Sequence, residues 1–199
     1  NTSAYKQCWM AENMQDGAGP ASAWVNSTDN GWYGYYGDGD QTPDVTPAGY
    51  DEKEGFVYQW SVAMNGATTE RSQGICPTGW HVPSDCEWMF LEHNIGMTIA
   101  EQTTNAAWRG TTEGTALKPG GTVQDGDGGT TSAFNGILAG YRNPNGSFYN
   151  RGTRAYYWSS SPSGSNAYRR NLNSSNTTVN RNTNTKAFAW SVRCLKIKN

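Results

Sequence analysis

Aliphatic side chains, which form most protein cores, are scarce in this chain. Leu, Ile, Val and Phe together occupy only 23 of its 199 positions, a proportion typical of chains that cannot bury a core. The net charge is only −2, however, and the chain has 9 Trp, 11 Tyr and 5 Phe. Each aromatic ring buries about 150 to 250 Å², so aromatic rings replace the missing aliphatic area. We therefore expect one folded domain, residues 1–199, with an aromatic core.

The clearest helix signal follows Pro83. Ser84 and Glu87 have the spacing of a capping box, and Gly96 marks the end of the apolar pattern. A second capping box, Thr98 with Glu101, predicts a shorter helix to about residue 107. Together these signals predict two short helices in the first half of the chain.

Most of the remaining first half is rich in glycine and polar residues. We interpret residues 29–55 as a surface loop and 56–64 as strand-like, and we expect no helix in the Gly- and Thr-rich stretch 110–133. After residue 133 the pattern predicts strands, at 156–161, 167–172, 176–181 and 188–194. Two early helices followed by a small, late antiparallel sheet, with much irregular loop, indicate the α+β class.

Charge is unevenly divided along the chain. Residues 1–127 hold all 17 acidic residues and 5 basic ones, a net charge of −12, whereas the last 72 residues hold 10 basic residues and no acidic one. Nucleic-acid binding is one reading of such asymmetry. The basic residues are dispersed among Asn, Ser and Thr instead of forming a run, so we expect a polar ligand-facing surface and no nucleic-acid partner. No stretch approaches the roughly 18 apolar residues of a membrane span.

Four cysteines, Cys8, Cys76, Cys86 and Cys194, lack the close-spaced partners of a zinc site. Disulfides are the favoured interpretation and indicate a location outside the cytosol.

Several segments together resemble the Fibrobacter succinogenes major paralogous domain family over nearly the whole chain. They are QCWMAENM (7–14), GFVYQWSVAM (55–64), ICPTGWHVPSDCEW (75–88), FNGILAGYR (134–142), GSFYNRGTRAYYWSSS (146–161), AYRRNL (167–172) and SVRCLK (191–196). The family is similar to the C-type lectin fold, and some members are variable proteins of diversity-generating retroelements. The stretch that usually precedes QCWM is missing, and the acidic segment at about 37–54 resembles an insertion.

The resemblance carries an expectation for the cysteines, because those of ICPTGW and SVRC recur together in the family. It implies a disulfide between Cys76 and Cys194, which leaves Cys8 to pair with Cys86.

Asparagine is concentrated where a variable region of such a protein would lie. Residues 143–186 hold 10 of the 19 asparagines, against about four for an even spread. An ordinary polar loop would also be rich in Asn, Ser and Thr. The regularly placed Tyr156, Trp158, Tyr168 and Leu172 favour a retained scaffold with a variable surface between its members.

Strand alternation then selects the residues of a binding face. In strand 167–172 we expect Tyr168 and Leu172 to point inward and Arg169 and Asn171 outward. The predicted ligand-binding residues are Tyr149, Asn150, Arg151, Arg154, Tyr156, Ser163, Ser165, Asn166, Arg169, Asn171, Asn173, Ser175 and Asn176.

Calcium is the one cation that the sequence suggests. Asp38, Asp40 and Asp44, and also Asp125 and Asp127, place carboxylates two or more residues apart in glycine-rich stretches. No complete EF-hand loop is present, and solvated turns explain the same aspartates. We therefore expect no cofactor and keep calcium as the alternative.

No catalytic motif surrounds any serine, and His81 and His93 have structural explanations. The favoured function is a non-enzymatic recognition domain, outside the cell or on a cell or virion surface, whose partner is a protein or glycan receptor. One alternative is a structural module of the cell envelope. Another is an enzyme of the related formylglycine-generating type, which the absence of a reactive cysteine pair disfavours.

Overall fold

The computed structural model of the chain describes residues 7–17, 22–37, 49–121, 123–124, 130–131 and 134–196. Its helical segments are η1 (Glu52–Glu54), α1 (Trp60–Ala63), α2 (Asp85–Asn94), α3 (Ile99–Gln102) and α4 (Glu113–Leu117). Its strands are β1 (Tyr33–Gly34), β2 (Val57–Tyr58), β3 (Trp80–His81), β4 (Ala107–Arg109), β5 (Val123–Gln124), β6 (Thr130–Thr131), β7 (Ala139–Arg142), β8 (Phe148–Arg151), β9 (Arg154–Ser163), β10 (Asn166–Asn173), β11 (Val179–Thr185) and β12 (Leu195–Lys196).

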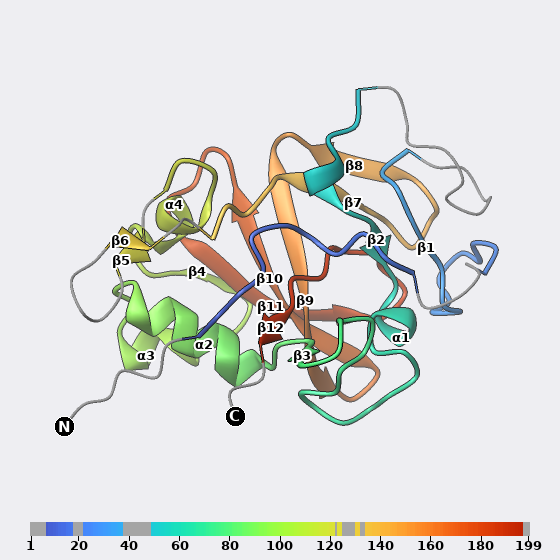
Figure 1. Cartoon of the computed structure of the whole chain (residues 1–199), viewed down its shortest axis with the longest axis horizontal. Coiled ribbons are helices and arrows are strands. Elements are labelled where there is room, and N and C mark those ends of the chain that lie inside the picture. The colour runs from blue at the N-terminus through green and yellow to red at the C-terminus, as the bar shows by residue number, and fades with distance from the viewer. Residues whose placement is uncertain are drawn as a thin grey trace.

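A six-stranded sheet in the order β4-β11-β10-β9-β7-β8 forms the centre of the molecule (Figure 1). The pairing of β7 with β9 is parallel, at Gly140 and Ala155, while the other neighbours are antiparallel. The helices α2, α3 and α4 lie to one side of the sheet in this view, and β1, β2 and α1 lie to the other (Figure 1). The class is therefore α+β as predicted, but the sheet is mixed instead of purely antiparallel.

Aromatic side chains fill the core on both faces of the sheet. Trp158 and Trp190, with ring centroids 4.0 Å apart, belong to the cluster that packs β9 against α1 and β2. On the opposite face, Trp88 of α2 packs against Tyr157, with ring centroids 5.6 Å apart. Large buried rings thus supply the apolar area that the sequence lacks in aliphatic residues.

Helix α2 begins where the capping box predicts. The Ser84 side chain accepts from the Glu87 backbone N–H, and the Glu87 carboxylate accepts from the Ser84 backbone N–H at 2.8 Å. The Thr98–Glu101 box likewise opens α3. This helix ends at Gln102, earlier than expected, and by Ala107 the chain has entered β4. Both predicted helix starts are confirmed.

Two stretches differ from the prediction through tertiary contacts. Helix α4 forms inside the stretch expected to lack helix, since Gly114 lets it approach the Thr178 carbonyl, which an added Cβ would meet at 2.1 Å. The expected surface loop 29–55 contains the buried Trp32 and the strand β1, which pairs with β2. The expected strand at 56–64 is shorter than predicted, because the chain turns into α1 at Trp60.

The segment 188–194 is not a continuous strand with one exposed face. It makes separate bridges, Trp190 to Tyr58, Ala189 to Arg142 and Ser191 to Tyr157, and both sets of alternating side chains are buried. It runs between elements on either side, so neither face is left to solvent.

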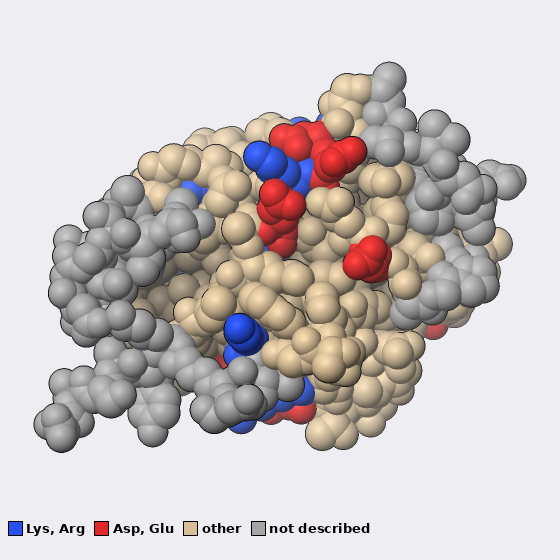
Figure 2. Space-filling model, in the orientation of Figure 1, with Lys and Arg blue, Asp and Glu red and all other residues tan. Residues whose placement is uncertain are grey.

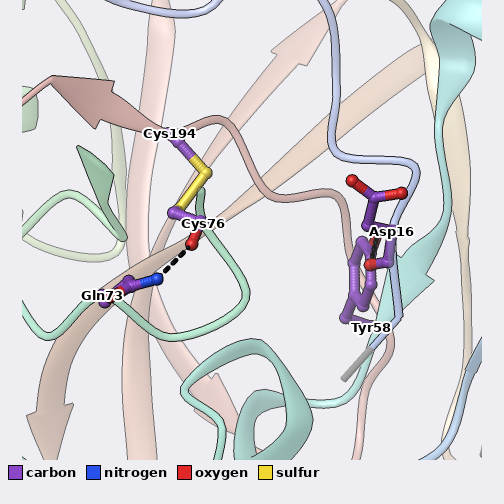
Figure 3. The surroundings of a disulfide bond; sticks show 5 residues. All are labelled: Asp16, Tyr58, Gln73, Cys76 and Cys194. Carbon is purple, nitrogen blue, oxygen red and sulfur yellow. Dashed lines mark hydrogen bonds between the residues drawn. A yellow bond between two sulfur atoms is a disulfide. The ribbon is translucent and has the colours of Figure 1, made fainter. Parts of the chain in front are cut away.

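The disulfide between Cys76 and Cys194 is present (Figure 3). It joins the loop after α1 to the residue before β12, and Gln73 Nε2 donates to the Cys76 carbonyl at 2.9 Å. The second expected disulfide is not formed, since Cys8 and Cys86 are both unpaired and exposed. Gln7 and Trp9, the residues on either side of Cys8, both contact α2. Because side chains alternate along an extended segment, the Cys8 side chain points away from α2 and from Cys86.

Candidate functional site

Arginine dominates the charge of the C-terminal half, but most of these guanidinium groups are inside the molecule. Tan atoms make up most of the described surface in Figure 2, and the acidic side chains on that face gather mainly in its upper middle part. Four of the seven arginines after residue 127 are at most 6% exposed, namely Arg142, Arg170, Arg181 and Arg193. The basic half of the sequence is therefore not a basic surface.

Strand alternation separates the two arginines at the centre of β10. Arg170 lies on the face of the sheet toward α2, where its Nη1 donates to Asp85 Oδ1 (2.7 Å) and its Nε to Glu92 Oε1 (2.5 Å). Arg181 makes a bidentate contact with Asp85, and Arg109 donates to Glu92. We call these five residues the buried ion network, and it joins α2 to β4, β10 and β11.

The network also sets the ionisation of Asp85. Burial alone raises the pKa of Asp85, but the hydrogen bonds and charges of Arg181 and Arg170 outweigh it, and the pKa of Asp85 lies below its ordinary value. Asp85 thus stays ionised beneath the sheet.

Arg169 faces the opposite way and leads to the candidate site. Its Nε donates to Asn184 Oδ1 (3.0 Å) and its Nη1 to Asn180 Oδ1 (2.6 Å), so two side chains of β11 hold it in place. Its Cζ lies 5.6 Å from the centroid of the Tyr156 ring. Burial, opposed by Tyr156 and reinforced by the charges of Arg170 and Arg154, lowers the pKa of Arg169 to about 10.

Tyr156 collects further polar side chains around its hydroxyl. Asn150 Nδ2 donates to Tyr156 Oη at 3.4 Å, and Arg154 Nη1 donates to the same oxygen at 3.3 Å. Tyr141 packs against Tyr156, with ring centroids 4.8 Å apart, and the 41% exposed Tyr149 packs against Tyr141. We name this set the arginine–tyrosine cluster: Tyr141, Tyr149, Asn150, Arg154, Tyr156 and Arg169.

The cluster brings together five of the thirteen residues expected on the binding face, and Tyr141 joins them. The sequence analysis missed Tyr141, Asn180 and Asn184, although the alternation of β11 would place both asparagines on one face. Tyr156 itself is only 8% exposed, and its hydroxyl oxygen is the atom that contacts Asn150 and Arg154.

Other predicted members of the face lie elsewhere. Arg151 Nη2 donates to Glu54 Oε1 at 2.7 Å, which commits its guanidinium to an ion pair. Asn171, expected to point to solvent, is only 2% exposed, and its Nδ2 donates to the carbonyls of Ala155 and Leu172. It shares the face of Arg169, but its amide is bonded to the backbone of the sheet and is not presented to solvent.

The two turns of the predicted face lie at opposite ends of the sheet. Ser163, Ser165 and Asn166 surround the β9–β10 turn, whereas Asn173, Ser175 and Asn176 surround the β10–β11 turn. Strand β10 separates the two turns by roughly 23 Å, at about 3.3 Å per residue. The thirteen residues therefore do not form one patch, and the β9–β10 turn is remote from the arginine–tyrosine cluster.

Asn173 and Asn176 also have local roles. Asn173 Oδ1 accepts from Ser175, and Asn176 Oδ1 accepts from Thr178, so both side chains hold the turn itself. Lys118 Nζ donates to the carbonyls of Asn173 and Asn176, each at 2.8 Å. The turn is thus fixed in shape next to the start of β9.

A second polar centre lies at the N-terminus of α2. His81 Nε2 is 2.9 Å from Glu87 Oε1, and Arg71 Nε is 3.0 Å from the same oxygen. Burial raises the pKa of Glu87, but the hydrogen bonds of His81 and Ser84 prevail and lower it to about 2. These contacts join the start of α2 to β3, through His81, and to the loop that contains Arg71.

The calcium candidates cannot be placed. Asp38, Asp40, Asp44, Asp125 and Asp127 lie outside the described residues. Within residues 7–17, 22–37, 49–121 and 134–196, no three His, Cys, Asp or Glu side chains are grouped to hold a metal ion. No helix in the described part of the chain is long and apolar enough to cross a membrane.

Comparison with known proteins gives one result. The family model described as Fibrobacter succinogenes major domain matches residues 4–196. No curated protein and no solved structure matches the chain significantly.

Proposed function

Because the chain belongs to the Fibrobacter succinogenes major domain family, we propose that it is a non-enzymatic recognition domain that binds a receptor through the arginine–tyrosine cluster. We further propose that its scaffold is C-type lectin-like and that it is a variable protein of a diversity-generating retroelement. In this proposal it acts outside the cell or on a cell or virion surface.

The composition and exposure of the cluster carry the proposal. Tyrosine and arginine supply large contact areas at modest entropic cost, and asparagine supplies adaptable hydrogen bonds. Tyr149 is one of only four large apolar or aromatic side chains recorded as exposed in the described part of the chain. An exposed tyrosine in the same cluster as two arginines has the makeup of a binding hot spot.

The rigid packing behind the arginine–tyrosine cluster also supports the proposed binding function. Trp190 stacks on the Tyr156 ring, with ring centroids 5.7 Å apart. On the other face of β10, the buried ion network joins the strand to α2. Surface side chains on such a support can change without removing a core contact. That separation of surface and support is what a diversified binding protein needs.

The location outside the cell rests on the disulfide. Cys76 and Cys194 are at most 3% exposed and bonded, and structural disulfides persist mainly in oxidising compartments. A structural cell-envelope module would share this property, so the disulfide supports the compartment and not the choice between the two functions.

The coding DNA provides the first test. We expect an adenine-biased near-repeat of the codons for residues 143–186, next to a reverse-transcriptase gene. Gene copies from related isolates should then differ mainly at codons for surface residues such as Tyr149 and Arg154, while the codon for Trp158 stays constant. A gene without a near-repeat, and with changes spread evenly over the chain, would favour the structural module.

Receptor binding provides the second test. Labelled protein is added to a panel of intact bacterial cells and to a glycan array, and binding is compared with that of Tyr149→Ala, Arg154→Ala and Ser165→Ala. At least one of the first two should weaken binding about 30-fold or more, as a hot-spot residue does. Ser165, exposed at the remote turn, is the matched control and should leave binding unchanged. Loss of binding only in Ser165→Ala would move the site to the β9–β10 turn.

A further inference from the structure

Two arginines of the arginine–tyrosine cluster differ from the five arginines of the chain that form ion pairs. Arg71, Arg109, Arg151, Arg170 and Arg181 each form an ion pair with Asp or Glu. Arg154 and Arg169 have no carboxylate partner in the part of the chain that the structure describes. Their contacts are instead a phenol oxygen and the neutral oxygens of Asn180 and Asn184, which leaves two positive charges uncompensated.

The Tyr156 hydroxyl adds a third donor at the same place. Its oxygen accepts from Asn150 and from Arg154, and no acceptor for its own hydrogen is recorded among the described residues. A phenol that already accepts twice has its O–H left to donate. The remaining N–H groups of Arg154 and Nη2 of Arg169 also lack a recorded acceptor within this part of the chain.

Of these groups, the Arg169 guanidinium is held in place by several neighbours. Asn180 and Asn184 fix two N–H groups of Arg169, and the Arg169 guanidinium also lies 5.7 Å from the centroid of Trp190. The lowered pKa of Arg169, caused mainly by burial, marks the cost of keeping this cation away from water without a counter-ion. An anion beside it would offset that cost, because an opposite charge favours the charged form.

We propose that Arg154, Arg169 and the Tyr156 hydroxyl form a subsite for a carboxylate group of the ligand, with Tyr149 contacting its apolar part. A carboxylate matches the planar fork of a guanidinium better than a point acceptor does, and it has a second oxygen for the phenol. This inference rests on the proposed function, since it assigns ligand chemistry to the same site. An acidic peptide side chain and an acidic sugar share this group.

The subsite is tested without any receptor, by titrating the intact protein with small probes. The probes are N-acetylglutamate amide and glucuronate as the two carboxylate sources, glucose as the neutral control, and sulfate as a non-planar anion. Binding is followed through the NMR signals of the arginine Nε–H groups and through the rise in melting temperature that mass action produces. We expect millimolar binding of at least one carboxylate, and weaker binding of sulfate and glucose.

Variants then locate the binding. Arg154→Gln and Arg169→Gln should each weaken carboxylate binding about tenfold or more, and Tyr156→Phe several-fold. Arg71→Gln removes the same charge from a side chain that is 65% exposed and remote in the fold, and it should bind like the parent protein. If Arg169→Gln fails to fold, Arg154→Gln and Tyr156→Phe still decide the question.

The outcomes separate the subsite from the proposed function. Carboxylate binding that is unchanged in both Arg154→Gln and Tyr156→Phe, or sulfate binding as tight as either carboxylate, overturns the subsite. Carboxylate binding without any binding to cells or glycans supports the subsite and contradicts the receptor function. A preference for glucuronate or for the glutamate derivative identifies the source of the carboxylate.

Discussion

Trp158 connects three parts of the chain through one side chain. It lies on β9, its indole Nε1 donates to the Tyr58 carbonyl at 2.7 Å, and its ring packs on Trp190. It is fully buried. In a chain with few aliphatic residues, one such ring replaces several leucines, so each buried tryptophan carries an unusually large share of the core.

Replacing Trp158 by Ala should therefore be severe. We expect the free energy of unfolding to fall by about 3 to 5 kcal/mol, as for other large-to-small core changes. Tyr149→Ala, in the exposed part of the arginine–tyrosine cluster, should change it by only about 0.5 kcal/mol. Urea denaturation of both variants measures the difference. Similar losses in the two would mean that the cluster is part of the core.

Alternation identifies which side chains share a face, but it does not reveal what covers that face. Arg169 and Asn171 share one face as predicted, yet Asn171 is buried and bonded to backbone carbonyls, and Arg169 is held by Asn180 and Asn184. The sequence pattern predicts the face from local geometry alone. Its covering depends on strand order, which brings β11 and the segment around Trp190 against β10 and which no local pattern encodes.

At the scale of elements, α2 is attached to the sheet by charge as well as by apolar packing. Asp85 in its first turn and Glu92 in its last turns accept from three arginines of β4, β10 and β11. The helix start was predictable because its capping box is local. The ion network was not, because it requires arginines from three separate strands to meet Asp85 and Glu92, and no local pattern specifies that meeting.

Breaking this network should cost more than breaking a surface pair. Arg170→Met leaves the buried Glu92 with only Arg109, and we expect a loss of about 3 to 5 kcal/mol in unfolding free energy. Arg71→Met removes a partner of Glu87 from an exposed position and should cost less than about 1 kcal/mol. Chemical denaturation compares them, and equal effects would show that the network is dispensable for stability.

The α2 N-terminus should make stability depend on acid. The folded-state pKa of Glu87 is about 2, below its ordinary value of 4.5, so ionised Glu87 stabilises the fold above about pH 4.5. This contribution, at most about 3 kcal/mol, is lost as the pH falls toward 2.

Thermal unfolding of the parent and Glu87→Gln at pH 7, 4 and 3 tests this. The variant should be less stable at pH 7, and the gap in melting temperature should narrow as the pH falls. Asp85, whose pKa is also lowered, is present in both proteins and cancels from the comparison. A gap that stays constant with pH would show that Glu87 ionisation contributes nothing.

At the scale of the whole molecule, the two oppositely charged halves of the sequence meet inside the fold. The acidic half supplies Asp85 and Glu92, and the basic half supplies Arg170 and Arg181. The uneven distribution of charge was evident from the sequence, but the burial of these charges was not. Charged residues of a surface and of an interior ion network look the same in a sequence. The disulfide between Cys76 and Cys194 was predictable only through the family resemblance.

The oxidised protein should contain two free thiols and one disulfide. We expect Cys8 and Cys86 to react with iodoacetamide in the native protein, and two further thiols to appear only after reduction under denaturing conditions. Cys76→Ser with Cys194→Ser should lower the unfolding free energy by up to about 4 to 5 kcal/mol, on the chain-entropy estimate. Mass spectrometry after alkylation counts the thiols. Native protein with no reactive thiol would restore the second disulfide.

The ends of the described chain lie side by side, since Trp9 bridges Leu195 and the Lys196 N–H donates to the Cys8 carbonyl at 2.9 Å. A pulling force applied at these two points would open that pairing first, one contact after another. The force would then act on Cys194, which lies two residues before Lys196. The bond between Cys194 and Cys76 spans a sequence separation of 118 residues. At about 3.3 to 3.6 Å per residue, roughly 400 Å of chain is withheld from extension while the bond is intact. Under tension the oxidised molecule would therefore behave as a short tether with a locked interior, and reduction would turn it into a long one.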